Sequence, residues 1–216
     1  MDLPRFYLIT GRKLVPNGDL LGSIRASFEG VDRLLQIREK ELLGGPLYRL
    51  ADAVKKLAEQ FNVKFLINDR VDVASAIGAD GVHLGSRGIS LNNLRYTFGK
   101  KMLLGYSAHT VEEAKAASCL GADFVTLSPI FPTRKEFAGP VMGLEGLRTA
   151  CSELNVPVYA LGGITPENVP DILDAGAYGV ALISYVFCDS DPGTRAREIV
   201  RLVEDEKRFR YFEKYE

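Results

Sequence analysis

One short unit occurs three times along the chain, and it constrains the fold more than any other feature. The copies are Gly78-Ala-Asp-Gly-Val-His-Leu-Gly85, Gly121-Ala-Asp-Phe-Val-Thr-Leu-Ser128 and Gly176-Ala-Tyr-Gly-Val-Ala-Leu-Ile-Ser184. Each copy is typical of a helix end, a tight turn and a buried strand that finishes at a small residue. A unit of this kind, repeated along one chain, indicates a parallel sheet whose strands alternate with helices.

The segments around these copies supply further strands and helices. We predict strands over 6–10, 31–37, 63–67, 102–106 and 156–161, besides the three within the repeated unit. We predict helices over 19–29, from 44 onward, and over 71–77, 110–119, 144–154, 166–175 and 193–205. Eight strands that alternate with helices, at about twenty-five residues per strand, predict an α/β fold, a single (β/α)8 TIM barrel over 1–216. A flavodoxin-like doubly wound sheet is the alternative, and it would need only about five or six strands.

Composition narrows the possible partners. The chain is 46% hydrophobic and 25% charged, which is typical of an ordinary globular domain and excludes disordered and fibrous classes. Its net charge of -1 provides no broad field that would attract nucleic acid, so any phosphate recognition must be local. No apolar run is long enough to span a bilayer. We therefore expect small-molecule ligands, no nucleic acid and no membrane partner.

The cysteines and the two ends of the chain bear on location and assembly. Three unevenly spaced cysteines without a CxxC pair, and an N-terminus without the charged and apolar regions of a signal peptide, predict a cytoplasmic protein with reduced thiols. The charged tail over 206–216 carries interleaved aromatic residues. We expect it to pack against the barrel or against a second subunit, and a homo-oligomer stays open.

The stretch Gln36-Ile-Arg-Glu-Lys40 ends the predicted strand over 31–37. If the alternation of a strand continues through it, Gln36, Arg38 and Lys40 face one side. Cations in a barrel interior are costly unless they meet an anion. The stretch therefore predicts a phosphate or diphosphate site, for which arginine and lysine are both suited, and a solvated strand end is the alternative.

Barrels of this kind place their function at the carboxyl ends of the strands. The predicted strand ends carry hydrogen-bond donors for phosphate and one carboxylate suited to magnesium. They are Gln36, Arg38 and Lys40, then Asn68 and Asp69, His83 and Gly85, Ser107 and His109, Ser128, Thr133 and Lys135, Gly162 and Gly163, and Ile183 and Ser184.

Gly162-Gly163 follows the seventh predicted strand, and Ile183-Ser184 follows the eighth. These are the positions at which many such barrels bind phosphate through backbone N–H groups. The loop over 129–140 is long enough to act as a lid, or it is an ordinary surface loop. We expect His83 to be a satisfied core histidine, and His109 to have at most a minor chemical role.

Several motifs in order match one family. They are Tyr7-Leu-Ile-Thr10, Gln36-Ile-Arg-Glu-Lys40, Ile67-Asn-Asp-Arg-Val-Asp-Val-Ala74, Gly78–Gly85, Ser107-Ala-His-Thr110, Pro129-Ile-Phe-Pro-Thr133, Gly143-Leu-Glu-Gly-Leu147 and Gly162-Gly-Ile-Thr-Pro-Glu-Asn-Val169. With these motifs the chain resembles the thiamine phosphate synthases and their TenI-type relatives over nearly its whole length. The resemblance implies a reaction that joins hydroxymethylpyrimidine diphosphate to thiazole phosphate and releases diphosphate.

The resemblance also implies a role for each matched residue. Arg38, Lys40, Asn68 and Ser107 would hold the diphosphate, Gln36 would help to seat the pyrimidine, Asp69 would bind Mg²⁺, and Thr133 would lie over the reacting pair. Gly163, Ile183 and Ser184 would take the thiazole phosphate, and Gly162 and Lys135 complete the predicted substrate-binding set.

Two departures from the family pattern leave alternatives open. Gly88 stands where the family usually has an aspartate that is its second magnesium ligand, and the Pro132–Lys135 segment is one residue shorter than the family's lid motif. The TenI branch, whose activity is a thiazole tautomerisation, has a catalytic histidine where this chain has Ser128-Pro129. We therefore expect a synthase with a weakened Mg²⁺ site. A TenI-type tautomerase is the second hypothesis, and a non-catalytic regulator that binds a phosphate ligand is the third.

Overall fold

The computed structural model describes residues 3–29, 33–133 and 140–204. Within them eight parallel strands close into a barrel in chain order, with β8 pairing with β1 through Tyr7 and Ala181. The strands are β1 (Phe6–Ile9), β2 (Leu34–Ile37), β3 (Lys64–Asn68), β4 (Gly81–Leu84), β5 (Leu103–Ala108), β6 (Phe124–Leu127), β7 (Val158–Leu161) and β8 (Gly179–Leu182). Because the sheet closes, the prediction of a TIM barrel is confirmed and the doubly wound sheet is wrong.

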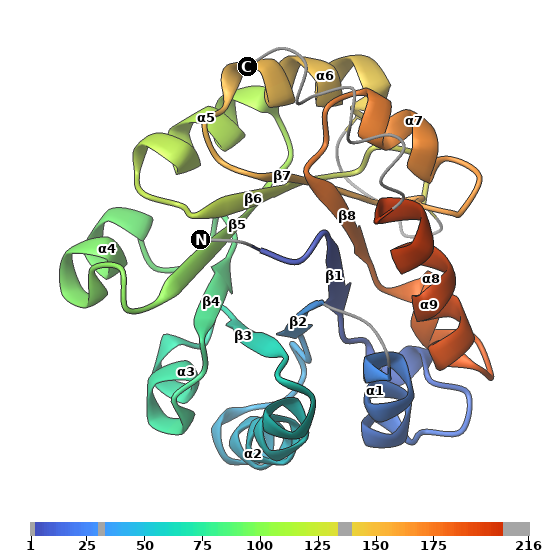
Figure 1. Cartoon of the computed structure of the whole chain (residues 1–216). Helices are drawn as coiled ribbons and strands as arrows, with labels where there is room; N and C mark the ends of the chain where they lie inside the picture. The colour runs from blue at the N-terminus through green and yellow to red at the C-terminus, as the bar shows by residue number, and fades with distance from the viewer. Residues whose placement is uncertain (1–2, 30–32, 134–139, 205–216) are drawn as a thin grey trace.

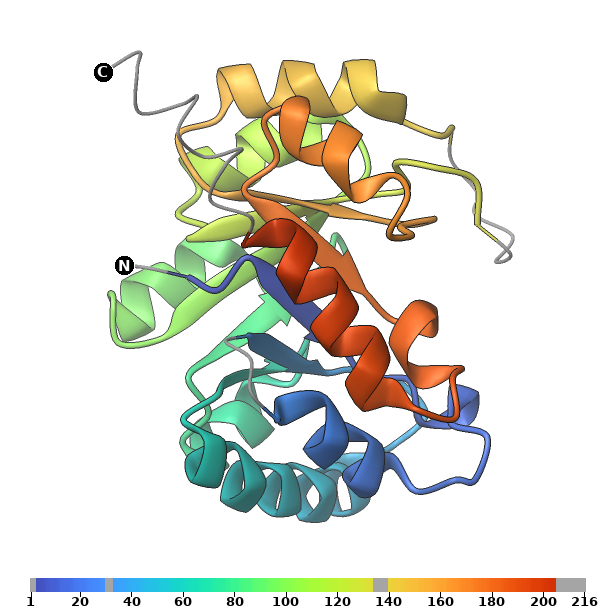
Figure 2. The same ribbon diagram turned by 45° about the vertical axis from the view of Figure 1, so that its right-hand side comes forward.

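Helices surround the strands on all sides, as Figure 1 shows. They are α1 (Leu20–Phe28), α2 (Gly44–Phe61), α3 (Val71–Ile77), α4 (Leu91–Phe98), α5 (Val111–Cys119), α6 (Gly143–Glu153), α7 (Val169–Asp174), α8 (Ser184–Phe187) and α9 (Pro192–Val203), with a short 3-10 helix η1 (Arg12–Leu14). The last helix, α9, packs against α1, so the ring of helices closes as the sheet does (Figure 2). None of the helices in the described part of the chain could cross a membrane.

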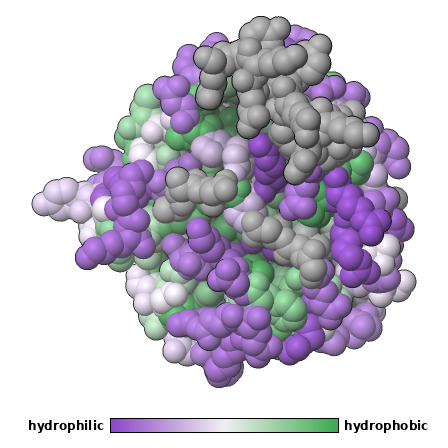
Figure 3. Space-filling view, in the orientation of Figure 1, coloured by the Kyte–Doolittle hydropathy of each residue, from purple (hydrophilic) through white to green (hydrophobic). Residues whose placement is uncertain are grey.

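Alternation along the strands divides the core into two parts. On β1, Tyr7 and Ile9 belong to the cluster inside the barrel, whereas Phe6 and Leu8 belong to the larger cluster between strands and helices. The outer surfaces of the helices are mainly hydrophilic, and such residues occupy most of the periphery in Figure 3. The site-bearing strand ends therefore rest on a barrel that is packed inside and outside.

The repeated unit has a physical basis in the structure. Gly78, Gly121 and Gly176 follow α3, α5 and α7 with φ angles of 64°, 96° and 95°, a conformation that glycine adopts without steric cost. In the first two copies the aspartate accepts a hydrogen bond from a strand backbone. Asp80 Oδ2 lies 3.0 Å from the Phe65 nitrogen, and Asp123 Oδ2 lies 2.9 Å from the Leu104 nitrogen. The unit thus ends a helix and attaches the next strand to its neighbour.

Candidate active site

The predicted site residues that the structure describes gather at one end of the barrel, where the carboxyl ends of the strands meet. Gln36 lies in β2, Asn68 ends β3, Ser107 lies near the end of β5, and Ile183 follows β8. Asp69, Gly162 and Ser184 directly follow β3, β7 and Ile183. Lys135 lies outside the described residues. The residues named above therefore lie at the strand ends from which they were selected.

A chain of hydrogen bonds crosses the barrel interior below this end. The Gln36 amide donates to the Tyr7 hydroxyl over 2.7 Å, and that hydroxyl lies 3.1 Å from His83 Nδ1. On the other side of the ring, His83 Nε2 lies 2.9 Å from Ser107 Oγ and 3.4 Å from Thr126 Oγ1. The chain connects β2, β1, β4, β5 and β6, and only Ser107 among its members is partly exposed.

The imidazole of His83 is held neutral in this setting. Burial, helped by the positive charge of Arg38, lowers the pKa of His83 to about 3. Burial also raises the pKa of the Tyr7 phenol well above its usual range, while the hydrogen bond from Gln36 opposes this shift. The prediction of a satisfied core histidine is therefore confirmed, since each ring nitrogen has a hydroxyl partner.

The end of β2 differs in one respect from the expectation. The paired part of the strand stops at Ile37, one residue before Arg38. Gln36 points into the barrel, Arg38 is half-buried, and Lys40 is exposed. Lys40 thus differs in burial from the other two members of the predicted set.

Glu39, which sequence reasoning did not select, anchors the turn after β2. It is only 5% exposed, and its two carboxylate oxygens accept hydrogen bonds from the Arg12 nitrogen over 3.1 and 3.2 Å. Its carboxylate also accepts from Thr10, whose Oγ1 in turn accepts from the Arg38 nitrogen over 2.9 Å. Burial raises the pKa of Glu39, although these hydrogen bonds oppose the shift. The backbone of Arg38 is thereby fixed to the end of β1.

The guanidinium of Arg38 interacts with the charges of Asp69 and Glu39. Burial lowers the pKa of its guanidinium, and the carboxylates of Asp69 and Glu39 partly restore it. The same guanidinium acts on His83 through its charge. Arg38 is therefore close to Asp69 and His83, as a residue in a shared anion site should be.

Asp69 is held in an unusual conformation. Its φ angle is 56°, in the left-handed region that few non-glycine residues occupy, and its nitrogen donates to the His83 carbonyl over 3.0 Å. Its Oδ2 accepts from the Asn68 amide over 2.8 Å, and its Oδ1 accepts from the Gly85 nitrogen over 3.3 Å. Backbone strain of this kind is often found at functional sites.

A magnesium ion would find one protein carboxylate here. Within the described part of the chain, no group of three or more acidic, histidine or cysteine side chains could hold a metal. Magnesium is usually bound by one or two carboxylates together with substrate phosphates. Asp69 therefore suits an ion that arrives with a diphosphate, and it does not form a metal cage by itself.

The loops after β6 and β7 pack closely on one another. Gly162 and Gly163 have φ angles of 97° and 68°. A Cβ atom on Gly162 would lie 2.9 Å from Pro129 Cα and 3.4 Å from Thr133 Cγ2, and one on Gly163 would lie 2.7 Å from Phe131 Cβ. The glycines thus serve loop packing as well as any approach of a phosphate, and they bring Thr133 beside the loop after β7.

The predicted phosphate positions after β8 begin a short helix. Ile183 precedes α8, and Ser184, its first residue, is exposed. The next residue, Tyr185, donates a hydrogen bond of 2.6 Å to Glu198 of α9. Contact with α9 therefore helps to hold α8 where the prediction requires it.

His109 lies at the β5 end, as expected, and its ring contacts the end of β6. Its Nδ1 is 2.8 Å from the Ser128 carbonyl oxygen, and its nitrogen donates to Glu113 over 2.7 Å. Thr110 is the N-cap of α5, because its side chain accepts from the Glu113 nitrogen. His109 thus holds two neighbouring strand ends together.

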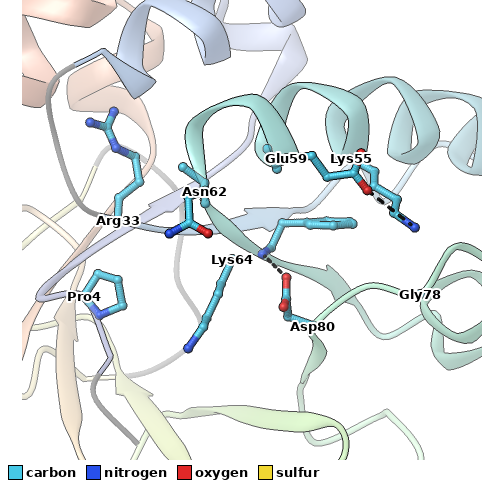
Figure 4. Close-up of a pocket in the computed structure, with 11 residues that line it drawn as sticks. Pro4, Arg33, Lys55, Glu59, Asn62, Lys64, Gly78 and Asp80 are labelled. Carbon is cyan, nitrogen blue, oxygen red and sulfur yellow. Dashed lines mark hydrogen bonds and ion pairs between the residues drawn. The ribbon is translucent and has the colours of Figure 1, made fainter.

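A cavity of about 450 Å³ opens at the opposite end of the barrel, where the strands begin. Arg33 precedes β2, Lys64 begins β3 and Asp80 precedes β4, while Lys55 and Glu59 form an ion pair on α2 (Figure 4). None of the predicted site residues that the structure describes lines this cavity. Because barrel enzymes carry their chemistry at the carboxyl ends of the strands, we assign the site to the other end.

Comparisons with known proteins agree with this geometry. A family model described as thiamine monophosphate synthase matches residues 6–186. The thiamine-phosphate synthase of Desulfitobacterium hafniense (strain DSM 10664 / DCB-2) is 40% identical over 197 residues, which cover 91% of this chain and 95% of that protein. The chain belongs to the thiamine monophosphate synthase family.

Other members of the thiamine monophosphate synthase family match over the same extent. The thiamine-phosphate synthase of Methanospirillum hungatei JF-1 is 36% identical over 198 residues, covering 91% of this chain and 96% of that one. The solved structure of thiamine phosphate pyrophosphorylase from Pyrococcus furiosus superposes with a TM-score of 0.85 at 33% identity, covering 93% of this chain and 96% of that chain. The resemblance inferred from the motifs is confirmed.

Some residues of this family site escaped sequence reasoning. Tyr7 and Thr126 look like ordinary members of buried strands, yet both contact the His83–Ser107 pair. A hydroxyl in the middle of an apolar strand was the available signal, because a buried hydroxyl needs a hydrogen-bond partner.

Proposed function

We propose that the protein is a thiamine-phosphate synthase. It would join hydroxymethylpyrimidine diphosphate to thiazole phosphate and release diphosphate. Family membership supports the transferase activity, and the observation that carries the assignment is the convergence of Arg38, Asp69 and Ser107 on one end of the barrel. Cation, carboxylate and hydroxyl are together suited to a diphosphate with its metal ion.

The reaction depends on stabilising the negative charge of the leaving diphosphate more than on acid–base catalysis. The bond between the pyrimidine methylene carbon and the diphosphate oxygen breaks, and its electron pair leaves with the diphosphate. The thiazole nitrogen then gives its lone pair to the methylene carbon. Fixed positive charge and donors that face the leaving oxygens lower the barrier to such a step. Arg38 would supply charge, and Ser107 and Asn68 would supply donors.

We further propose that Asp69 holds a magnesium ion when the diphosphate is bound. The metal would supply additional positive charge on the leaving group. Asn68 and the Gly85 N–H hold the Asp69 carboxylate in place through hydrogen bonds of 2.8 and 3.3 Å. The backbone of Asp69 is in the left-handed conformation, with its nitrogen hydrogen-bonded to the His83 carbonyl.

The thiazole phosphate would lie on the other side of the barrel mouth. Gly162 and Gly163, with Ile183 and Ser184, follow β7 and β8 there, and Thr133 lies next to Gly162. The two substrates would thus meet between β2–β5 and β7–β8. The phosphate groups of the two substrates are what the site recognises.

We also propose a cytoplasmic location, because the three cysteines are free thiols.

Titration of the purified protein with the pyrimidine diphosphate tests the proposal. A synthase must bind this substrate in the presence of Mg²⁺, whereas a TenI-type tautomerase has no use for it. The end of β6 carries Ser128 and Pro129 rather than a histidine, which favours the synthase. Binding of the thiazole phosphate alone would contradict the proposal and favour a tautomerase or a regulator.

A further inference from the structure

The hydrogen-bond chain from Gln36 to Ser107 has a direction. The Gln36 amide nitrogen donates to the Tyr7 oxygen over 2.7 Å. A phenol has one proton, and the Tyr7 oxygen lies 3.1 Å from His83 Nδ1. Among the described residues the Tyr7 hydroxyl has no other acceptor within hydrogen-bond distance, so its buried proton goes to Nδ1. Nδ1 must then be the ring nitrogen without a hydrogen.

The other nitrogen of the ring follows from this assignment. The ring's hydrogen-bond partners, Tyr7, Ser107 and Thr126, all offer hydroxyl groups, which do not stabilise an imidazolium as a carboxylate would. A neutral imidazole whose Nδ1 accepts carries its hydrogen on Nε2. Nε2 therefore donates to Ser107 Oγ over 2.9 Å.

Ser107 receives a second hydrogen bond on the same oxygen. Thr126 Oγ1 donates to Ser107 Oγ over 3.4 Å. A hydroxyl has two lone pairs and one rotatable proton. With both lone pairs directed at His83 and Thr126, the proton of Ser107 points away from the buried chain. Ser107 is partly exposed at the barrel mouth, so this direction leads into the substrate site.

We propose that Tyr7 and His83 are positioning residues that fix the Ser107 hydroxyl as a hydrogen-bond donor toward the leaving diphosphate. A free hydroxyl could present either its proton or a lone pair to the anion, and only the proton is attractive. The hydrogen-bond chain excludes the orientation of Ser107 that would present a lone pair, and it does so before the substrate binds. Such preorganisation makes a hydrogen-bond donor effective in catalysis. The inference rests on the proposed function only for the identity of the acceptor.

Nitrogen NMR of the wild-type protein tests the direction of the chain without any assay. The protein contains two histidines, His83 and His109. A spectrum of the ¹⁵N-labelled imidazoles can therefore be assigned with a single variant, His109→Gln. We expect a protonated, pyrrole-type Nε2 and an unprotonated, pyridine-type Nδ1 for His83. The opposite tautomer would overturn the proposal, because His83 would then accept from Ser107.

Tyr7→Phe tests the consequence, with Tyr159→Phe as the matched control. Tyr159 packs against Tyr7 inside the barrel, but its hydroxyl donates to the Pro4 carbonyl over 2.6 Å and does not belong to the chain. Both variants lose one hydroxyl that is hydrogen-bonded in the folded protein. We expect Tyr7→Phe alone to give a mixture of His83 tautomers, and to lower kcat several-fold, because only the molecules with the other tautomer lose the fixed donor.

The split between kinetic constants separates positioning from simple destabilisation. We expect KM for the thiazole phosphate to stay unchanged in Tyr7→Phe, since that substrate would bind near β7 and β8. Equal kinetics and a single tautomer in both tyrosine variants would overturn the proposal. If the wild type forms no thiamine phosphate, the proposed function fails. The tautomer and the affinity for inorganic diphosphate in Tyr7→Phe still decide the positioning role.

Discussion

Asp69 Oδ1 lies 3.1 Å from the point that a Cβ atom on Gly88 would occupy. Gly88 is exposed, and its φ angle lies outside the left-handed region, so a side chain at this position needs only a small shift of its neighbours. The position at which the family usually carries an aspartate is thus directly beside the one carboxylate of the proposed metal site. A second carboxylate there would face the same cation as Asp69.

Gly88→Asp should therefore lower the Mg²⁺ concentration at which turnover is half-maximal. A second anionic ligand adds charge and one coordination position to a site that now has a single carboxylate. Gly88→Asn, which has the same shape without the charge, is the control and should change the requirement much less. Turnover measured against Mg²⁺ for the three proteins checks this. Coincident curves would show that position 88 does not reach the metal.

Arg38→Ala should weaken binding of the pyrimidine diphosphate by about tenfold to a hundredfold, since a hydrogen bond to a charged group contributes roughly 1.5–3 kcal/mol. The fold should survive, because the backbone of Arg38 is held by Thr10 through its own nitrogen. Isothermal titration calorimetry measures the change. Arg148→Ala removes an exposed arginine that pairs with Glu145 on α6, and it should leave the affinity as it was.

Ser184→Ala should weaken binding of the thiazole phosphate about tenfold, by roughly 1.5 kcal/mol, the lower end of the range for a hydrogen bond to a charged group because Ser184 is exposed, and leave the affinity for the pyrimidine diphosphate unaltered. Ser184 is a better probe than Gly163, because a side chain on Gly163 would collide with Phe131 and Pro132 and disturb the loop after β6. Ser190→Ala, at another exposed serine, is the control. An equal loss for both ligands would argue against separate phosphate positions.

The buried imidazole predicts a specific dependence of stability on pH. The pKa of His83 is lowered to about 3 by burial and by Arg38, whereas the unfolded chain has a histidine pKa of about 6.5. Below about pH 6.5 the unfolded state takes up a proton that the folded state does not. The free energy of unfolding is therefore not reduced by His83 above that pH. As the pH falls from about 6.5 toward 3, it decreases by up to about 1.4 kcal/mol per pH unit.

Urea unfolding of the wild type and of His83→Gln between about pH 7 and about pH 4 measures this term. The variant lacks the titrating ring but keeps the carboxylates that also respond to acid. The difference in free energy of unfolding, wild type minus variant, should fall as the pH is lowered through this range. A difference that does not change with pH would mean that His83 takes up its proton in the folded protein as readily as in the unfolded chain.

Much of the fold could be predicted because short stretches of the sequence determine where helices end and strands begin. The repeated glycine ends helices in the left-handed conformation, and the apolar runs that follow become the strands. The helix α4 was not predicted, since only Leu91 and Leu94 of its eight residues are buried and the apolar pattern is weak. The four-residue α8 and the 3-10 helix η1 are too short to show a period at all.

The site was predictable residue by residue but not as a network. Strand ends placed Arg38, Asp69 and Ser107 together, because parallel strands deliver their carboxyl ends to one face. The partnership of Tyr7 with His83 joins positions 76 apart in the chain, and it depends on the register of a closed barrel. Glu39 was overlooked because its hydrogen-bond partner, the Arg12 nitrogen, lies 27 positions away in the chain.

Formation of thiamine phosphate by the purified protein tests the central claim most directly. The protein would be incubated with hydroxymethylpyrimidine diphosphate, thiazole phosphate and Mg²⁺, and both thiamine phosphate and released diphosphate would be quantified beside Ser107→Ala. We expect the two products in equal amounts from the wild type, with the rate reduced about tenfold to a hundredfold in the variant. No thiamine phosphate at any Mg²⁺ concentration, from a folded protein that binds the thiazole phosphate, would contradict the assignment as a synthase.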